Sequence, residues 1–353
     1  MDNILQNIID GNRMTNDEFV KLYNNADLIK LGQAANKVRL NKFGNDLATF
    51  VIDRNINYTN ICLCKCKFCA FYREKDDDDA YILDEKTLLD KVEEAISLGA
   101  TQLMIQGGLN KDLDITYFEQ MFRLIKSKYD ITIHSLSAPE IVHIAKMSNL
   151  TIEETLHRLK IAGLDSLPGG GAEILHDEVR KQISPKKIKT KEWLNVMQAA
   201  HNAGIYSTAT MMMGSVESLE HRLSHLDVIR KLQDETGKFR AFIMWTYQAT
   251  LNTIAGKHVS AVEYLKFLAL SRLYLDNFSH IQGSLVTQGE HIGQLSLFFG
   301  ADDLGSVMLE ENVVKAAGVD NKINESAMLK LIKTTGRTPA LRDTEYNILK
   351  IFD

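Results

Sequence analysis

Short apolar runs alternate with amphipathic helical segments along most of this sequence, and that alternation restricts the fold more than any other feature. The runs lie at residues 56–63, 101–108, 131–137, 165–171, 206–214, 240–248, 280–287 and 294–303. They are brief and apolar, as parallel strands buried on both faces usually are. Eight such strands alternating with helices predict an α/β fold, a (β/α)8 barrel of the TIM type.

An open, doubly wound sheet is the alternative arrangement for the same pattern. It gains no support, because no Gly-x-Gly-x-x-Gly turn follows the first run. The link between the last two runs is short for a helix, which weakens the count of eight. Because no linker interrupts the chain, we expect a single domain overall, with a helical N-terminal extension at 1–50 and a barrel with C-terminal helices at 51–353.

Charge and hydropathy narrow the range of partners. The 353-residue chain carries a net charge of −5 and no basic block, so nucleic acid is not an expected partner. No stretch approaches the roughly 20 apolar residues of a membrane span, and the N-terminus lacks the basic start and apolar core of a signal peptide. These features predict a cytoplasmic location, where thiols stay reduced.

Glycines and polar or sulfur-bearing side chains follow these runs, where a barrel would gather them at one mouth. Each has an ordinary explanation when taken singly: His134 as a hydrogen-bonded core residue, the methionines as core filler and Asp302 as a helix cap. Their joint placement favours a site at the mouth. Besides the cysteines, the residues are Gln106, Gly107, Gly108, His134, Ser135, Gly169, Gly170, Gly171, Glu173, Met211, Met213, Gly214, Glu217, Trp245, Tyr247, Gln248, Thr287, Gln288, Asp302 and Asp303.

All four cysteines lie within residues 62–69, and a reduced compartment makes them metal ligands rather than disulfides. Cys62, Cys66 and Cys69 have the spacing Cys-x3-Cys-x2-Cys, which can aim three thiolates at one [4Fe–4S] cluster and leave its fourth iron open to a small molecule. A zinc site or a closed cluster that also uses Cys64, in a binding protein without turnover, is the alternative. Structural zinc, however, usually takes two cysteine pairs separated by a longer loop.

The same cysteines resemble the signature of the radical S-adenosylmethionine enzymes. The resemblance continues through MIQGGLN, IHSLSAPEIVHIAK, GLDSLPGGGAEIL, ATMMMGSVE, LQDETGKFRAFIMWTYQ and GADDLGSVMLEENVVKAAG, over about residues 45 to 350. Together these motifs are similar to the cyclic dehypoxanthinyl futalosine synthases, which serve menaquinone biosynthesis by the futalosine pathway. FIMWTYQ and GADDLGSVMLEENVV favour that group over its sisters, the aminofutalosine synthases and the two halves of the deazaflavin-precursor synthase. The relatives commonly have a proline soon after the Tyr-Gln pair, which YQATLNT lacks, so the substrate contacts of this loop stay open.

The resemblance implies two cofactors, a [4Fe–4S] cluster on Cys62, Cys66 and Cys69 and an S-adenosyl-L-methionine on the open iron, with Cys64 as a bystander. It implies that one electron, from reduced flavodoxin or ferredoxin, converts S-adenosylmethionine to a 5′-deoxyadenosyl radical. In the family, this radical takes a hydrogen atom from the 4′ carbon of the ribose of dehypoxanthinyl futalosine. The carbon radical then adds to the benzoate ring, and loss of an electron and a proton restores aromaticity.

Particular residues are expected to serve this chemistry. Glycines allow close approach of the main chain to the cofactor, and flat or soft side chains suit its adenine. The expected cofactor-binding residues are Phe68, Gly107, Gly108, Glu173, Met211, Met213 and Gly214. The expected substrate-binding residues are Trp245, Tyr247, Gln248, Thr287 and Gln288. His134, Asp302 and Glu310 are the candidates for the base that accepts the final proton, and the sequence does not choose among them.

Overall fold

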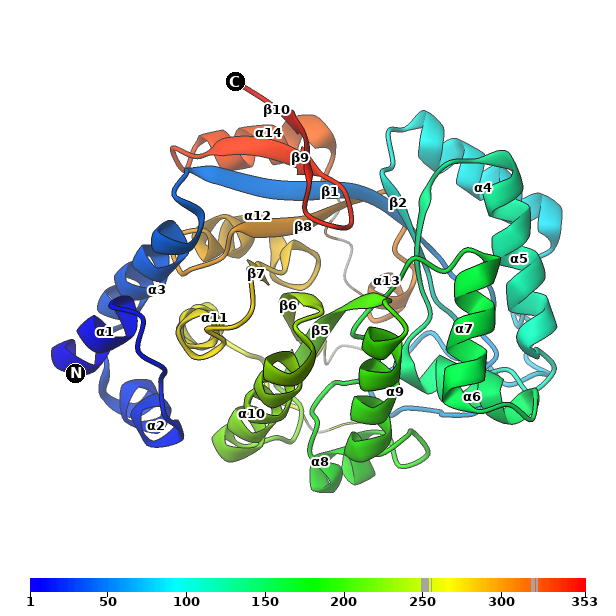
Figure 1. The fold of residues 1–353 in the computed structure, drawn as a ribbon, viewed down its shortest axis with the longest axis horizontal. Helices are drawn as coiled ribbons and strands as arrows, with labels where there is room; N and C mark the ends of the chain where they lie inside the picture. Colours follow the sequence, from blue (N-terminus) through cyan, green and yellow to red (C-terminus); the bar gives the residue numbers. More distant parts are fainter. Residues whose placement is uncertain (249–253, 255, 319–320, 322) are drawn as a thin grey trace.

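The computed structural model describes residues 1–248, 254, 256–318, 321 and 323–353, and it contains a closed barrel of parallel strands (Figure 1). Each strand from β1 to β8 pairs in parallel with the next, and β1 also pairs with β8. This closure confirms the (β/α)8 barrel and excludes the open doubly wound sheet. The strands are β1 (Leu47–Ile56), β2 (Gln102–Ile105), β3 (Thr132–Ser135), β4 (Ser166–Leu167), β5 (Tyr206–Met213), β6 (Phe239–Thr246), β7 (His280–Gln282) and β8 (Asp303–Met308).

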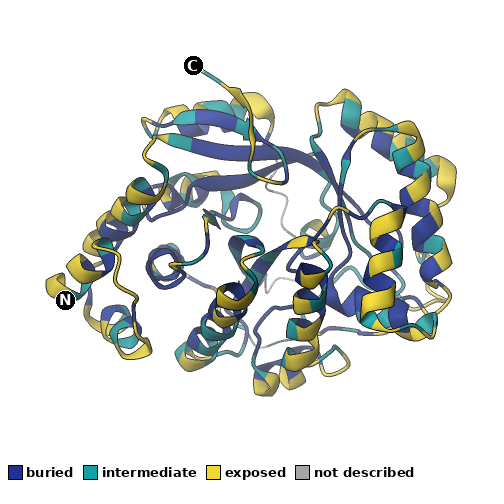
Figure 2. Ribbon diagram, viewed as in Figure 1, coloured by how far each residue is buried: buried dark blue, intermediate teal, exposed yellow. Residues whose placement is uncertain are grey.

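Helices surround the barrel; most of them bury one face and expose the other, whereas α11 (Ala261–Tyr274) is buried almost all round (Figure 2). Asp84 caps the first of them by accepting from the Thr87 N–H, and Thr151 and Glu154 form the expected capping box. The helices are α4 (Glu85–Ser97), α5 (Ile115–Lys128), α6 (Ala138–Met147), α7 (Ile152–Ala162), α8 (Asp177–Ile183), α9 (Thr190–Asn202), α10 (Leu219–Thr236), α11 (Ala261–Tyr274) and α12 (Leu285–Ser296).

The first strand begins earlier than expected. Three N-terminal helices, α1 (Asp2–Ile9), α2 (Asn16–Asn25) and α3 (Leu28–Phe43), are followed at once by β1. The prediction of a first strand at 56–63 was therefore wrong, and the helical extension ends before residue 50. As a result, the cysteines lie in a loop beyond the strand instead of beginning within it.

The eighth strand begins later than expected. The prediction of a strand at 294–303 was wrong, because residues up to Ser296 belong to α12 and β8 begins at Asp303. Leu297 and Phe299 are buried while Leu295 and Phe298 are exposed, and so short an apolar run does not distinguish a strand from the end of a helix. The missing helix between the last two strands is α12 itself.

The C-terminal tail is only partly helical. After α13 (Val313–Ala316) and α14 (Glu325–Lys333) come two unexpected strands, β9 (Thr338–Arg342) and β10 (Ile348–Ile351). β9 pairs in parallel with the first residues of β1, and β10 pairs antiparallel with β9 (Figure 1). The sheet therefore has ten strands, of which eight close the barrel.

The turn at 343–347 covers the N-terminal end of the barrel. Thr344 donates to Gln102 at the start of β2, and its carbonyl accepts from Arg240 near the start of β6. The ring of Tyr346 stacks on His280, the first residue of β7, with 3.6 Å between ring centroids. This turn therefore closes the bottom of the barrel, which leaves the end with the strand-to-helix loops as the mouth.

Candidate active site

One cavity of about 450 Å³ occupies the interior of the barrel. All four cysteines line it, and so do residues of the C-terminal turn at the opposite end, including Thr344 and Tyr346. Side chains or main-chain atoms from each of the eight barrel strands, or from the loops that follow them, contribute to its wall. The cavity thus extends from the cysteine loop at the mouth to the closed bottom of the barrel.

Main-chain hydrogen bonds hold the cysteine loop against three other segments. The Cys62 N–H donates to the Arg73 carbonyl at 3.1 Å, the Leu63 N–H to the Leu109 carbonyl at 3.1 Å, and the Lys67 N–H to the Ile183 carbonyl at 2.9 Å. In return, the Leu109 N–H donates to the Cys62 sulfur at 3.4 Å. The loop is therefore fixed by the segments that follow β2 and α8 as well as by itself.

The spacing of the four sulfurs fits an iron–sulfur cluster better than a single zinc ion. The Cys64 thiol lies beside Cys62 and Cys66, and its proximity lowers the pKa of Cys62 to about 5 and also lowers the pKa of Cys66, while its Sγ lies 3.9 Å from the Lys186 carbonyl oxygen. In the described part of the chain, no three cysteine sulfurs all lie within 4.8 Å of one another. Tetrahedral zinc–thiolate bonds of about 2.3 Å would bring the sulfurs to about 3.8 Å apart. In a [4Fe–4S] cluster each thiolate binds a different iron, so wider spacing fits.

Glu173 offers an unused hydrogen-bond acceptor at the mouth. The residue is buried with a positive φ of 40°, and its Oε1 accepts from Lys187 Nζ at 3.0 Å, whereas its Oε2 has no partner. Burial alone would lower the pKa of Lys187, but the neighbouring Cys66 and Glu173 raise it above the ordinary value. The ammonium also lies 5.1 Å from the centroid of the Phe68 ring. An unsatisfied buried carboxylate oxygen is suited to an amine or hydroxyl of a bound cofactor.

Arg180 holds the glycine-rich loop that carries Glu173. Its buried guanidinium donates to the carbonyls of Gly171 at 3.1 Å, Ala172 at 2.6 Å and Ile188 at 2.6 Å. Burial lowers the pKa of Arg180, yet among the described residues no carboxylate accepts a hydrogen bond from the guanidinium. The loop geometry therefore depends on one cation bound by main-chain oxygens.

Gly107 and Gly108 line the cavity, and packing within the protein already requires both to be glycine. A Cβ on Gly107 would lie 2.7 Å from the Tyr58 ring, and one on Gly108 would lie 2.2 Å from the Ile61 carbonyl oxygen. The Gly107 N–H donates to Glu140, which also accepts from Tyr58 at 2.8 Å. The glycines thus bring the β2 loop against the start of the cysteine loop.

The methionines of β5 do not line the cavity. Side chains of a strand alternate between its two faces, and Thr208 and Thr210 point into the cavity while Met211 and Met213 are fully buried outside it. The predicted adenine wall of methionines was therefore wrong, and core packing explains them. Gly214 also lies outside the lining and donates its N–H to Glu217 Oε1 at 2.6 Å.

Only one of the three predicted bases lines the cavity. His134 does so; its Nδ1 lies 2.6 Å from Ser166 Oγ, and burial lowers its pKa to about 3. Asp302 instead precedes β8 at the bottom of the barrel, where it pairs with Arg272 and His280.

Glu310 also lies outside the cavity, in an ion-pair network with Arg54 and Lys91. The prediction that Asp302 and Glu310 face the reaction was wrong. Asp302 was misplaced because the eighth strand was predicted too early in the sequence, whereas Glu310 does follow β8 but turns its carboxylate toward Arg54 and Lys91.

The predicted substrate residues fall mostly on the cavity wall. Trp245, Tyr247, Gln248 and Thr287 line it, and Trp245 meets the Phe68 ring edge-on with centroids 6.5 Å apart. Gln288 does not line it but donates to Thr246 Oγ1 at 2.6 Å. The loop whose missing proline was noted above, at 249–253, lies outside the described residues.

Several cavity residues were missed in the sequence. Asp53 and Asn55 stand two positions apart on β1 and point into the cavity, and an acidic side chain in so apolar a strand was the signal that could have found them. Lys187 lies in a loop and carries no comparable signal. The missed residues are Asp53, Asn55, Gln102, Glu140, Lys187, Ser306, Arg342 and Thr344.

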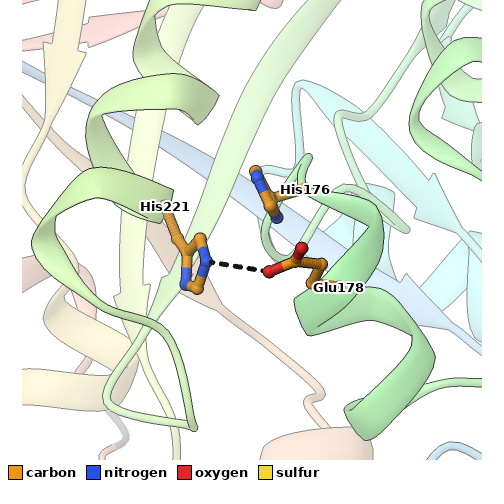
Figure 3. Close-up of side chains that lie close together, drawn as sticks. All are labelled: His176, Glu178 and His221. Carbon is orange, nitrogen blue, oxygen red and sulfur yellow. Dashed lines mark ion pairs between the residues drawn. The ribbon is translucent and has the colours of Figure 1, made fainter.

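A separate cluster of His176, Glu178 and His221 lies between the N-termini of α8 and α10 (Figure 3). His221 Nε2 lies 3.8 Å from Glu178 Oε2, while its Nδ1 accepts from the Ser218 N–H at 3.1 Å. In a neutral ring, a hydrogen bond accepted at Nδ1 leaves the proton on Nε2. Nε2 could bind a metal only if that proton moved to Nδ1, and Nδ1 would then no longer accept from Ser218 at the start of the helix. The positive ends of two helix dipoles also disfavour a cation here. We therefore assign this cluster no metal.

Comparison with known proteins identifies the class. A model of the radical SAM superfamily matches residues 56–229, and a model described as the CofH/MqnC C-terminal region matches residues 236–353. This chain belongs to the radical SAM superfamily, whose members are enzymes that use a [4Fe–4S] cluster and S-adenosylmethionine. Its cysteine loop, at the mouth of the barrel, is the corresponding cluster site.

Named relatives cover nearly the whole chain. The cyclic dehypoxanthine futalosine synthase of Halalkalibacterium halodurans is 44% identical over 100% of this chain and 96% of its own length. That of Streptomyces coelicolor is 45% identical over 99% of this chain and 90% of its own length. A 5-amino-6-(D-ribitylamino)uracil–L-tyrosine 4-hydroxyphenyl transferase of Archaeoglobus fulgidus is 41% identical, over 86% of this chain and 89% of its own length.

Solved structures with the same fold are more distant in sequence. The crystal structure of methylornithine synthase matches with a TM-score of 0.75 at 17% identity, over 96% of this chain and 97% of that one. The hydrogenase maturase HydG from Carboxydothermus hydrogenoformans matches with a TM-score of 0.77 at 18% identity, over 98% of this chain and 80% of that one. At such identities the likeness concerns the fold alone.

Proposed function

We propose that this protein is a radical enzyme that cyclises dehypoxanthinyl futalosine to its cyclic form, a step of menaquinone biosynthesis. The observation that carries the proposal is the full-length similarity to two cyclic dehypoxanthine futalosine synthases. The position of the cysteine loop supports it, because the loop opens onto a deep cavity that is closed at the far end. When bound there, the cluster and S-adenosylmethionine supply the one-electron chemistry that generates a carbon radical.

Residues at the mouth have roles that follow from their contacts. Cys62, Cys66 and Cys69 would hold the cluster, with the thiol of Cys64 beside it. Glu173 would accept a hydrogen bond from the amine or ribose of S-adenosylmethionine through its unpartnered Oε2. Gly107 and Gly108 would present the main chain of the β2 loop to the methionine portion of the cofactor, since both line the cavity.

Residues deeper in the cavity would hold the substrate and exclude water. Trp245 and Phe68 form an aromatic edge near the cysteines, suited to a flat ring. Gln248 and Thr287 are polar groups at the same level of the wall. His134 is neutral at physiological pH because burial lowers its pKa to about 3, so it would act as a hydrogen-bonding group and only as a weak base.

The electron must come from outside the chain. We propose reduced flavodoxin or ferredoxin as the donor and a cytoplasmic location, where such reductants and reduced thiols coexist. Among the described residues, no helix is long and apolar enough to cross a membrane.

An anaerobic turnover assay tests the proposed function. The protein, reconstituted with iron and sulfide, is mixed with S-adenosylmethionine, a reductant and dehypoxanthinyl futalosine, and the products are identified by mass spectrometry. We expect 5′-deoxyadenosine and a product two mass units lighter than the substrate, because cyclisation removes two hydrogen atoms. Release of 5′-deoxyadenosine with the substrate mass unchanged would contradict the proposal.

A second candidate is the transfer of a hydroxyphenyl group from tyrosine to 5-amino-6-(D-ribitylamino)uracil. The observation that favours it is the 41% identity to the archaeal transferase, over most of both chains. The same assay with tyrosine and the ribityl uracil in place of the futalosine substrate separates the two. A coupled product from that pair would establish the transferase instead.

A further inference from the structure

Polar side chains gather at the bottom of the cavity. We call this group the polar floor; it consists of Asp53, Gln102, His134, Gln282, Ser306 and Thr344, all of which line the cavity. The polar floor draws on five barrel strands and the C-terminal turn, so its members are far apart in sequence. Nothing in the cluster or cofactor chemistry at the mouth requires a polar surface at this depth.

The position of Asp53 on β1 places it well below the cysteines. β1 ends at Ile56, and the cysteine loop follows. At about 3.3 Å per residue of strand, Asp53 lies roughly 10 Å back along β1 from the end of that strand. In the register, Asp53 stands opposite Gln102, the first residue of β2, and opposite Met308, the last residue of β8. A molecule bound beneath the cofactor would therefore reach Asp53 with its distal end.

Asp53 is a buried carboxyl group with unused acceptor capacity. Its side chain accepts from Gln102 Nε2 at 2.8 Å and from the Ser306 hydroxyl, one bond to each oxygen. Each carboxylate oxygen can accept a second hydrogen bond. Gln102 is itself held by the Thr344 hydroxyl at 2.6 Å, which fixes the orientation of its amide toward Asp53.

Among the described residues, no hydrogen bond or ion pair joins a cation to Asp53. Burial raises the pKa of this carboxyl, and the nearby Arg342 opposes the rise. Arg342, which also lines the cavity, is held by Asp303 through two hydrogen bonds. His134 is neutral. An incoming carboxylate would thus meet two acidic groups, Asp53 and Asp303, that share one cation, which is unfavourable in a buried site. Hydroxyl groups, in contrast, can donate to the free acceptor positions of Asp53 and accept from the neutral donors around it.

We propose that the polar floor is the subsite for the sugar hydroxyls of the substrate, with Asp53 as their principal hydrogen-bond partner. The benzoate carboxylate then points away from the floor, toward the wall near Thr287 and Gln248. This inference rests on the proposed function, since the ribose of dehypoxanthinyl futalosine supplies the hydroxyls. Asp53 is in this sense a positioning and specificity-determining residue, which orients the ribose beneath the cofactor.

A double-mutant cycle between Asp53 and each ribose hydroxyl tests the subsite. Wild-type holoenzyme and Asp53→Asn are assayed anaerobically with dehypoxanthinyl futalosine and with analogues that each lack one hydroxyl. Loss of one side-chain hydrogen bond implies a roughly two- to ten-fold rise in KM for Asp53→Asn with the full substrate. For the analogue that lacks the hydroxyl bound by Asp53, the KM of wild type should rise by the same factor. The KM of Asp53→Asn for that analogue should equal its KM for the full substrate. The KM for S-adenosylmethionine should not change.

The controls separate a binding role from a structural one. Glu119→Gln removes a carboxylate from α5, where Glu119 pairs with Arg158 on the outside of the barrel, and should leave all KM values unchanged. If Asp53→Asn does not fold, Ser306→Ala takes its place in the same cycle, with a smaller factor expected. In addition, the wild-type response to each missing hydroxyl is informative without any variant.

Two outcomes overturn the inference in different ways. If each analogue raises the KM of wild type and of the floor variants by the same factor, no hydroxyl depends on the polar floor. The subsite is then refuted while the proposed function stands. If wild type does not convert dehypoxanthinyl futalosine at all, the proposed function fails and the subsite fails with it.

Discussion

Replacing Arg180 with Met should dislocate the loop that carries Glu173. The guanidinium donates to the carbonyls of Gly171, Ala172 and Ile188, and a thioether cannot replace any of these bonds. A buried acceptor left without a partner costs about 1–3 kcal/mol. Three such acceptors would cost about 3–9 kcal/mol, from which the relief of burying a cation subtracts part. We therefore expect a loss of about 4 kcal/mol in the free energy of unfolding.

The matched control is Arg158→Met. Arg158 lies on α7 and its side chain is 41% exposed, whereas that of its partner Glu119 is 9% exposed. Arg123 also lies 3.6 Å from Glu119 and stays in place in the control, so we expect the loss of this half-exposed pair to cost about 1 kcal/mol. Both variants remove the same charge and introduce the same side chain, so the difference between them isolates the main-chain contacts of Arg180.

Thermal unfolding and turnover measure the two consequences. At about 2–4 °C per kcal/mol for a large domain, the Arg180 variant should unfold roughly 10 °C below wild type and the control within about 2 °C of it. The KM for S-adenosylmethionine should rise about ten-fold or more in the Arg180 variant, because Glu173 loses its position, while bound iron stays unchanged. Equal melting temperatures for the two variants would refute the reasoning that main-chain carbonyls depend on Arg180.

Three further predictions concern the cluster, the loop packing and pH. Cys66→Ala should lose its bound iron and its brown colour while Cys64→Ala keeps both, and iron analysis of the two variants would reverse our ligand choice if it gave the opposite result. Gly108→Ala should reduce iron content and destabilise the fold by about 1–3 kcal/mol, because its Cβ would lie 2.2 Å from a carbonyl oxygen of the cysteine loop; unchanged iron and melting temperature would contradict this. Burial lowers the pKa of His134 and of His225 to about 3, so the unfolded chain binds their protons below about pH 6.5 and the folded chain does not. The free energy of unfolding should therefore decrease as the pH is lowered below about 6.5, by up to about 1.4 kcal/mol per pH unit for each histidine. Urea midpoints that coincide at pH 7 and pH 5 would exclude this.

The barrel could be predicted because apolar residues are spaced differently in the strands and in the helices along most of the chain. The runs at 101–108, 131–137 and 206–214 contain β2, β3 and β5. The errors fell where that contrast was weak. At 294–303 an apolar run continued past the end of α12, and a short run fits a helix end as well as a strand. The two C-terminal strands were missed because β9 pairs with β1, almost 300 residues away in sequence, and β10 pairs only with β9.

The site was predictable where chemistry alone selects the residue type. Cys62, Cys66 and Cys69 could be found from spacing, and the glycines after β2 from their repetition at strand ends. Met211 and Met213 could not be placed, because the face of β5 that points inward depends on register, and a shift of one residue exchanges the two faces. Lys187 could not be found, since its contact with Glu173 arises only from the path of the loop after α8.

The C-terminal strand β9 and the turn after it close one end of the barrel, and this closure matters for radical chemistry. A carbon radical reacts with accessible hydrogen donors, so a chamber with two openings would be a poor place to generate one. β9 and the turn at 343–347 supply Arg342 and Thr344 to the bottom of the cavity, and these residues bind the starts of β8 and β2. The same turn that seals the barrel thus also orients Gln102 toward Asp53. In the proposed subsite, sealing and substrate orientation depend on the same contacts, so a variant that loosens the turn should increase uncoupled cofactor consumption together with the KM for substrate.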